Sequence, residues 1–190
     1  MTGKNIIALA LLLLVAGGFY FLFKSGLVRA PEALLNSYRN EAYGIEFTYP
    51  DGYVLDEKEV GNGERRHYNI SLFEDTPFVR DLLAGKVLGT EAPPSISVDF
   101  YQNDLDNQAL WAWIRGTNFS NWKLSDERYA STTIDGTEAV TYTWDGLYRG
   151  ESVVFLHGGN VVMLSVTYHT PEDKLRSDFE ETVAPSFKTF

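Results

Sequence analysis

The three histidines are the candidate general bases for nucleophilic catalysis, and because the chain contains no cysteine, the nucleophile would be a serine. A serine hydrolase needs a histidine within hydrogen-bonding reach of the nucleophile and oriented by a carboxylate. His157 stands beside a Gly-Gly pair, and His169 closes the last predicted strand. Neither lies in a known nucleophile signature. We therefore assign no catalytic residue, and the sequence favours a protein without catalytic activity.

Anion binding is the chemistry that basic clusters would suggest. His67 follows Arg65 and Arg66, and such a trio could receive an anion, but the sequence favours a solvated strand edge. The whole chain has 16 Lys and Arg against 26 Asp and Glu, a formal net charge of −10. Because binding to a phosphate backbone is driven by basic residues, this balance excludes nucleic acid as a partner.

Carboxylates offer two further possibilities. A glycan or peptide hydrolase of the cell envelope could use two paired carboxylates, but spacing alone does not select a pair among 26 acids. Residues 103–107 resemble the start of a calcium loop, yet Ala109 and Arg115 stand where an EF-hand requires glycine and glutamate. Helix capping explains that run better. Weak calcium sites remain open at two groups of acids: Asp56 with Glu57 and Glu59, and Glu180 with Glu181. No metal ligand set and no cofactor site is assigned.

The strongest physical signal is the uncharged run at residues 6–23, flanked by Lys4 and Lys24. Its 18 residues would span about 27 Å as a helix, close to the hydrocarbon core of a bilayer. A cleaved signal peptide, the alternative, would use a site ending at Ala30, where Pro31 follows. We expect a single-pass protein of the cell membrane that contacts the bilayer through residues 6–23. Its predicted parts are a cytoplasmic head (1–5), a transmembrane signal-anchor (6–23), a tether (24–37) and an extracytoplasmic domain (38–190).

Period-two alternation dominates the predicted domain. Strands are expected at residues 45–49, 53–60, 68–73 and 96–100. Three turn pairs, Asp135-Gly136, Asp145-Gly146 and Gly158-Gly159, then separate strands near 128–134, 137–144, 147–157 and 160–169. If each turn has two residues, one sheet face carries the following side chains: Val140, Tyr142, Trp144, Val153, Phe155, Val162, Leu164, Val166 and Tyr168. The other face carries Val154, Leu156, Val161 and Met163, and must also be covered.

Three segments could provide helical covers. A helix is predicted from Leu105 through Trp113, with Gly116 just past its end, and another from Pro171 to Val183, which Pro185 should stop. A last short strand is expected at residues 186–190. The third segment, residues 76–94, begins with a short helix and returns irregularly through glycines and prolines. It either covers the second sheet face or binds an envelope protein partner. Helices flanking an antiparallel sheet make an α+β domain.

The segment from Tyr38 to Pro50, reading YRNEAYGIEFTYP, resembles the opening strand of PsbP-like domains, and the hairpin at Asp135-Gly136 and the closing Ser186-Phe187 also look like that superfamily. The resemblance implies an α/β/α sandwich around an antiparallel sheet. Tyr53 stands where the family often has tryptophan. Photosynthetic members assist a manganese-calcium cluster, but no metal ligand carries over to this chain. Many membrane-tethered bacterial members have no assigned activity, so the resemblance concerns the fold.

These observations together predict a membrane-tethered extracytoplasmic interaction or assembly module without catalytic activity. The alternatives are the paired-carboxylate hydrolase and the weak calcium-binding domain. A concave cleft that brings two acids within about 5 to 10 Å would favour the hydrolase.

Overall fold

The computed structural model describes residues 34–61, 65–102 and 108–190. No helix within these ranges is both long enough and apolar enough to cross a membrane. The predicted head, the transmembrane segment and most of the tether lie outside the described residues, so those assignments stay predictions. Residues 35–190 form a compact unit.

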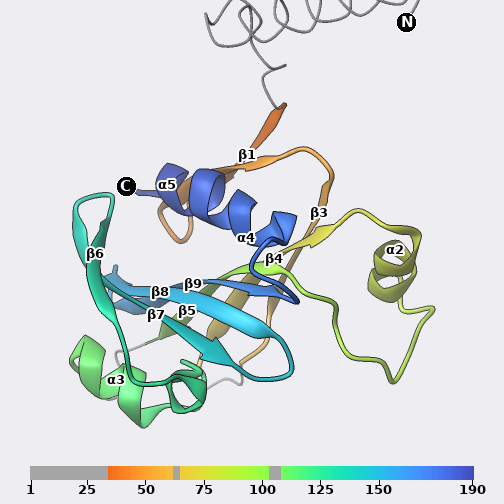
Figure 1. The fold of residues 1–190 in the computed structure, drawn as a ribbon. Helices are drawn as coiled ribbons and strands as arrows, with labels where there is room; N and C mark the ends of the chain where they lie inside the picture. Colours follow the sequence, from red (N-terminus) through yellow and green to blue (C-terminus); the bar gives the residue numbers. More distant parts are fainter. Residues whose placement is uncertain (1–33, 62–64, 103–107) are drawn as a thin grey trace, which may run out of the picture. The chain divides into compact units, whose positions relative to one another are not determined.

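The unit contains two antiparallel sheets (Figure 1). The larger has seven strands in the order β3-β4-β5-β9-β8-β7-β6. Its strands are β3 (Tyr53–Glu59), β4 (His67–Glu74), β5 (Ile96–Gln102), β6 (Ala130–Ile134), β7 (Thr137–Asp145), β8 (Arg149–His157) and β9 (Asn160–Tyr168). The smaller sheet joins β1 (Leu35–Asn40), β2 (Ile45–Pro50) and β10 (Lys188–Thr189) in the order β1-β2-β10. Strand β1 includes residues 35–37, which the sequence pattern had placed in the tether.

Two of the three predicted tight turns are confirmed. Ile134 pairs with Thr137 across Asp135-Gly136, whose φ angles are 47° and 78°. His157 likewise pairs with Asn160 across Gly158-Gly159. Positive φ at both turn residues matches the right-handed twist of the strands, which explains why Gly and Asp occupy these places.

The third turn is longer than predicted, and this reverses one face assignment. Asp145 pairs with Arg149, so the connection contains three residues, 146–148, and not two. A shift of one residue sends every side chain of a strand to the opposite face. Val140 consequently pairs with Val154, and Tyr142 with Ser152. The prediction that Val140, Tyr142 and Trp144 share a face with Phe155 was wrong, because they lie on the face of Val154.

The two faces of the large sheet have separate cores. The first face packs against β2 and a C-terminal helical segment made of α4 (Lys174–Asp178), a π-helical turn (Phe179–Val183) and α5 (Ala184–Ser186). The second face packs against α3 (Leu110–Gly116) and a short 3-10 helix (Trp122–Leu124). Figure 1 shows the C-terminal helices and α3 on opposite sides of the sheet. Antiparallel sheets with flanking helices confirm the predicted α+β class.

Both predicted covering helices begin later than expected. Helix α3 starts at Leu110, and its last residue is Gly116. The C-terminal helix starts at Lys174. The Asp173 carboxylate accepts hydrogen bonds from the N–H groups of two preceding residues, His169 (2.6 Å) and Thr170 (3.1 Å), and these bonds hold residues 169–173 outside the helix. Pro185 does not stop the helix. The helical segment continues to Ser186, one residue beyond the proline.

Candidate functional site

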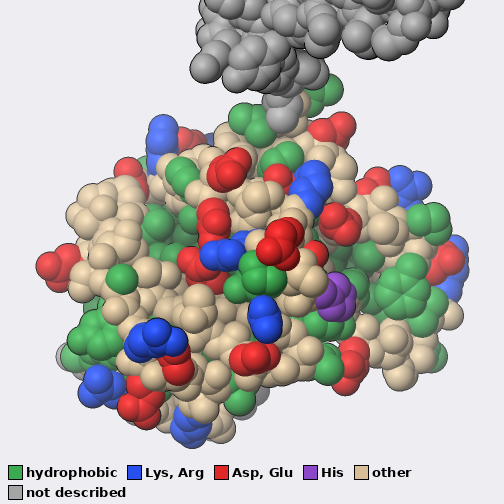
Figure 2. Space-filling model, in the orientation of Figure 1, with side chains coloured by type: hydrophobic (Ala, Val, Ile, Leu, Met, Phe, Trp, Pro, Cys, Tyr) green, Lys and Arg blue, Asp and Glu red, His purple; other side chains and the backbone are tan. Residues whose placement is uncertain are grey.

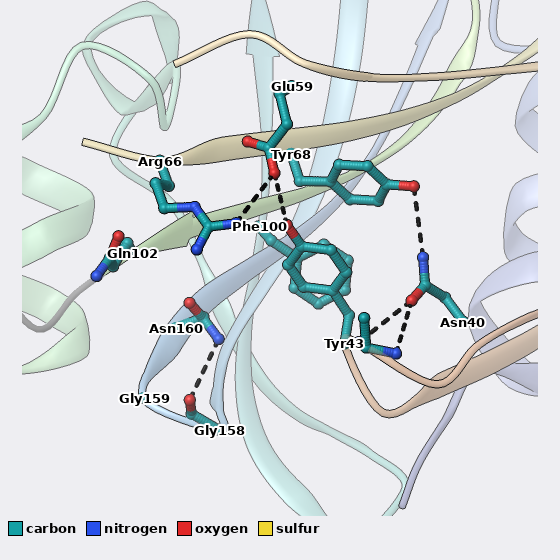
Figure 3. Close-up of a pocket in the computed structure, with 11 residues that line it drawn as sticks. Asn40, Tyr43, Glu59, Arg66, Tyr68, Phe100, Gln102, Gly158, Gly159 and Asn160 are labelled. Carbon is teal, nitrogen blue, oxygen red and sulfur yellow. Dashed lines mark hydrogen bonds and ion pairs between the residues drawn. The ribbon is translucent and has the colours of Figure 1, made fainter. Parts of the chain in front are cut away.

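A cavity of about 720 Å³ lies at one end of the large sheet, and we call it the tyrosine cavity (Figure 3). It is lined by Asn40, Ala42, Tyr43, Glu59, Arg66, Tyr68, Phe100, Gln102, Gly158, Gly159 and Asn160. These residues come from the β1–β2 turn, the end of β3, the start of β4, the end of β5 and the β8–β9 hairpin. Antiparallel pairing places the end of one strand beside the start of the next, which gathers these distant segments.

A side-chain hydrogen bond shapes the wall of the cavity. The Asn40 Oδ1 atom accepts from the N–H groups of Ala42 (3.0 Å) and Tyr43 (3.2 Å). Such an Asx turn fixes the backbone of a short connection. Its result is that the Tyr43 ring stacks on Tyr68, with centroids 4.5 Å apart, and contacts Phe100 at 4.7 Å. Figure 3 shows these rings gathered along one wall.

The tyrosine hydroxyls are held as neutral donors to carboxylates. Tyr43 Oη donates to Glu59 Oε1 (3.1 Å), and Arg66 Nη2 lies 3.5 Å from the same oxygen. Tyr38 and Tyr68 both donate to Glu57, each at 2.7 Å. Burial, and then the bond to Glu59, raises the pKa of Tyr43. The two hydroxyl donors lower the pKa of Glu57, so its carboxylate is stabilised in the charged form.

The described lining offers aromatic rings, amide side chains, a guanidinium and one carboxylate. Glu59 is the single carboxylate among the described lining residues, which include no serine, threonine or histidine. The two-acid arrangement that the hydrolase alternative requires is therefore not found among them. Ring edges, amide side chains and a guanidinium remain, which suit hydrogen bonding and stacking.

Both groups of acids proposed as weak calcium sites contain carboxylates that have other partners. Asp56 accepts from Lys58 (3.1 Å), and Glu180 lies 2.8 Å from Arg176. Within the described ranges no group of three or more histidine, aspartate or glutamate side chains converges as a metal site. Residues 103–107, the calcium-loop lookalike, lie outside the described residues.

His67 is placed differently from the prediction of a solvated strand edge. Its side chain is 18% exposed, its Nε2 atom lies 2.6 Å from Asp99 Oδ1, and its ring stacks on Tyr101. Asn69 also donates to Asp99 Oδ1 (2.9 Å), and Ser71 donates to Asn69 (2.8 Å). Sequence reasoning missed this buried polar chain. The alternation of polar residues along β4 was the one sequence signal for this chain. Its acceptor, Asp99, lies about 30 residues away, and the contact depends on the strand register.

The segment at residues 76–94, which we call the α2 segment, does not cover the sheet. Helix α2 (Pro77–Leu83) begins where Thr76 Oγ1 accepts from the Val79 N–H (3.2 Å), and Val79 is its single buried residue. Three of the segment's large apolar side chains face solvent, with exposed fractions of 46% for Phe78, 37% for Leu83 and 85% for Leu88. In Figure 1 the helix lies beyond the edge of the sheet, and Figure 2 shows hydrophobic side chains at the surface there. The prediction of a cover was wrong, because α3 performs that role.

A groove of about 290 Å³ separates the α2 segment from the start of α4. Its lining combines apolar and polar side chains: Glu74, Thr76, Phe78, Val79, Pro93, Pro94, His169, Asp173, Lys174 and Leu175. The basic residues of the α2 segment are already paired within the segment or next to it. Arg80 binds Asp75 through two nitrogens, at 2.5 and 2.6 Å, and Lys86 binds Asp81 at 2.7 Å. The surface therefore presents apolar side chains beside two basic residues that are already paired.

The fold alone resembles that of PsbP-like α+β domains. Among solved structures, the chain is similar to cyanobacterial PsbP (CyanoP) from Synechocystis sp. PCC 6803. The TM-score is 0.51 at 14% sequence identity, and the alignment covers 86% of this chain and 98% of the cyanobacterial one. The predicted resemblance is thus confirmed for the fold. No protein-family model and no curated protein matches the sequence.

Proposed function

We propose that this protein is a membrane-tethered, extracytoplasmic interaction or assembly module that binds an envelope protein through the α2 segment. The observation that carries the proposal is the exposure of Phe78, Leu83 and Leu88 on a segment that contributes one buried residue from its helix. Burial of large apolar side chains is the main favourable term in protein association, so such a surface is stabilised by a partner.

The described groups of the tyrosine cavity donate and accept hydrogen bonds and stack, which suits a binding role. Tethering rests on the apolar run at residues 6–23. The PsbP-like fold is compatible with this role, but fold alone does not define a function.

Site-specific photocrosslinking in cells that express the full chain tests the contact. A benzoylphenylalanine at Leu88 should give a discrete adduct with another envelope protein. The matched control is Leu147, which is 67% exposed but lies in the β7–β8 turn. The double variant F78S/L83S should weaken the adduct at position 88. Adducts of equal yield at positions 88 and 147, or none at position 88, would contradict the assignment.

Fractionation tests the tether separately. The full chain should sediment with membranes, resist extraction by high salt and be released by detergent, with its C-terminal domain digested by protease added outside the cytoplasmic membrane. A chain lacking residues 1–30 should be found in the soluble fraction. Recovery of the intact chain in the soluble fraction would remove the tether from the proposal.

A further inference from the structure

Strand β6 is an edge of the large sheet with unused main-chain hydrogen-bonding groups. It pairs with β7 alone. The tight turn joins the Ile134 carbonyl to the Thr137 N–H, so Ile134, Thr132 and Ala130 direct their main-chain groups toward β7. By alternation, Ser131 and Thr133 direct theirs outward. No hydrogen bond from these outward main-chain groups to another described residue is present.

The edge lacks the features that normally protect exposed strands. Natural edge strands carry charges or proline, which prevent another strand from adding to them. Strand β6 reads ASTTI, without charge or proline, and its first four residues are exposed. The opposite edge of the sheet, β3, shows the usual protection, since its last four residues are DEKE. The two edges of one sheet therefore differ, and β6 is the one open to pairing.

A groove of about 550 Å³ runs beside this edge. Its apolar side chains come from Leu110, Trp111 and Val140, and Ser131, Thr132, Thr133, Glu138 and Ala139 complete the lining. The wall at Trp111 is held firmly. Its indole meets Tyr129 edge-on at 4.5 Å and Trp122 at 5.5 Å, and the Arg115 guanidinium lies 4.9 Å from its ring centroid. A large apolar side chain fits such a groove, because it would contact aromatic and aliphatic walls.

Glu138 adds a charge at a defined distance from the apolar part. Its side chain is exposed and lines the groove, and it makes no ion pair with another described residue. Thr133 pairs with Glu138, whereas Ser131 pairs with Val140. A residue of an added strand opposite Thr133 would thus reach Glu138, and the residue two positions away would enter the apolar part of the groove.

We propose that β6 binds an extended segment of a partner protein, which adds a strand to the sheet and carries Lys or Arg two residues from a large apolar residue. The unpaired main-chain groups provide affinity, and the groove with Glu138 provides selectivity. A second copy of β6 does not fit this description, since it would offer serine and threonine to the groove. In Figure 1 this edge lies on the far side of the domain from α2, so it is a surface distinct from the α2 segment.

Selection of peptides tests the inference on the full chain in detergent micelles. The probe is a phage-displayed library of random heptapeptides. The matched variants are S131P and S131A, because proline removes the outward N–H without breaking the ladder to β7, whereas alanine keeps it. We expect enrichment of peptides with Lys or Arg two positions from Leu, Ile, Phe or Met. Their affinity should fall by about tenfold or more in S131P, the effect of one lost main-chain hydrogen bond, and stay unchanged in S131A.

Two further variants keep the test decisive. T133P removes the other outward N–H. It is used in place of S131P if S131P melts at a lower temperature than S131A. E138K should reverse the charge preference, so that Asp or Glu replaces the basic residue in the selected peptides. The inference is overturned if no such pattern is enriched, or if enriched peptides bind a folded S131P or T133P variant as tightly as the unaltered chain. Because this readout does not involve residues 76–94, it is independent of the function proposed above.

Discussion

Replacement of Asp99 should reveal how far the second sheet face depends on its buried polar chain. Asp99 is 5% exposed, and its Oδ1 atom accepts from both His67 and Asn69. The change D99L would leave these two donors without their acceptor in a site that water reaches poorly. Each unsatisfied donor costs about 1–3 kcal/mol, so for two donors we expect a loss of about 2–6 kcal/mol in the free energy of unfolding. The change D99N keeps an oxygen in place and should cost about 1 kcal/mol.

Chemical denaturation followed by tryptophan fluorescence measures both changes, since Trp113 and Trp122 are buried on the same face. The double variant H67F/D99L provides a control. It removes one donor together with the acceptor, and it should recover about 1 kcal/mol or more relative to D99L alone. Equal losses for D99N and D99L would refute the reasoning, because they would show that the acceptor oxygen contributes nothing beyond the shape of the side chain.

Three smaller changes are also predictable. A Cβ at Gly150 would lie 2.2 Å from the Trp144 ring, so G150A should cost about 1–3 kcal/mol and red-shift the fluorescence of that indole. A Cβ at Gly44, where φ is +62°, would lie 2.5 Å from the Phe190 carbonyl oxygen, so G44A should lower the melting temperature and speed proteolysis of the C-terminus. Burial, followed by repulsion from a nearby glutamate, raises the pKa of Glu151. Its charged form is therefore disfavoured in the fold, and E151Q should raise the urea midpoint at about pH 7 but not at about pH 3.5, where both states are protonated. An unchanged midpoint at neutral pH would contradict that sign.

The sequence was sufficient to predict most strands and the fold class. Alternation predicted β2, β4 and β5, and two glycine-containing turn pairs predicted the flanking hairpins because their backbone requirement is local. The α+β class followed from these elements. Strand β1 was missed in part because residues 35–37 read Leu-Asn-Ser, which is not a strand pattern. These residues form a strand because they pair with β2.

Register was the information that local patterns did not contain. Asp145-Gly146 has the composition of a two-residue turn, yet the chain continues through Leu147 and Tyr148 before pairing resumes. Apolar residues occur at both parities of β7 and β8, so the hydrophobic pattern alone fits either register. What decides between them is tertiary packing: Tyr142 donates to the carbonyl of Ser120 (2.6 Å) on the second face.

The candidate sites depend on that same missing information. The tyrosine cavity joins residues from five segments, and the His67–Asp99 pair depends on Asn69 lying opposite Asp99. The groove at β6 exists because α3 lies over the second face. The α2 segment does not lie over that face. A helical pattern tells which side of a helix is apolar, but not which surface that side will meet. In this protein the short helix α3 packs on the sheet, whereas α2 lies at the surface. Helix α3 is therefore part of the core, and α2 belongs to a surface that is suited to bind a partner.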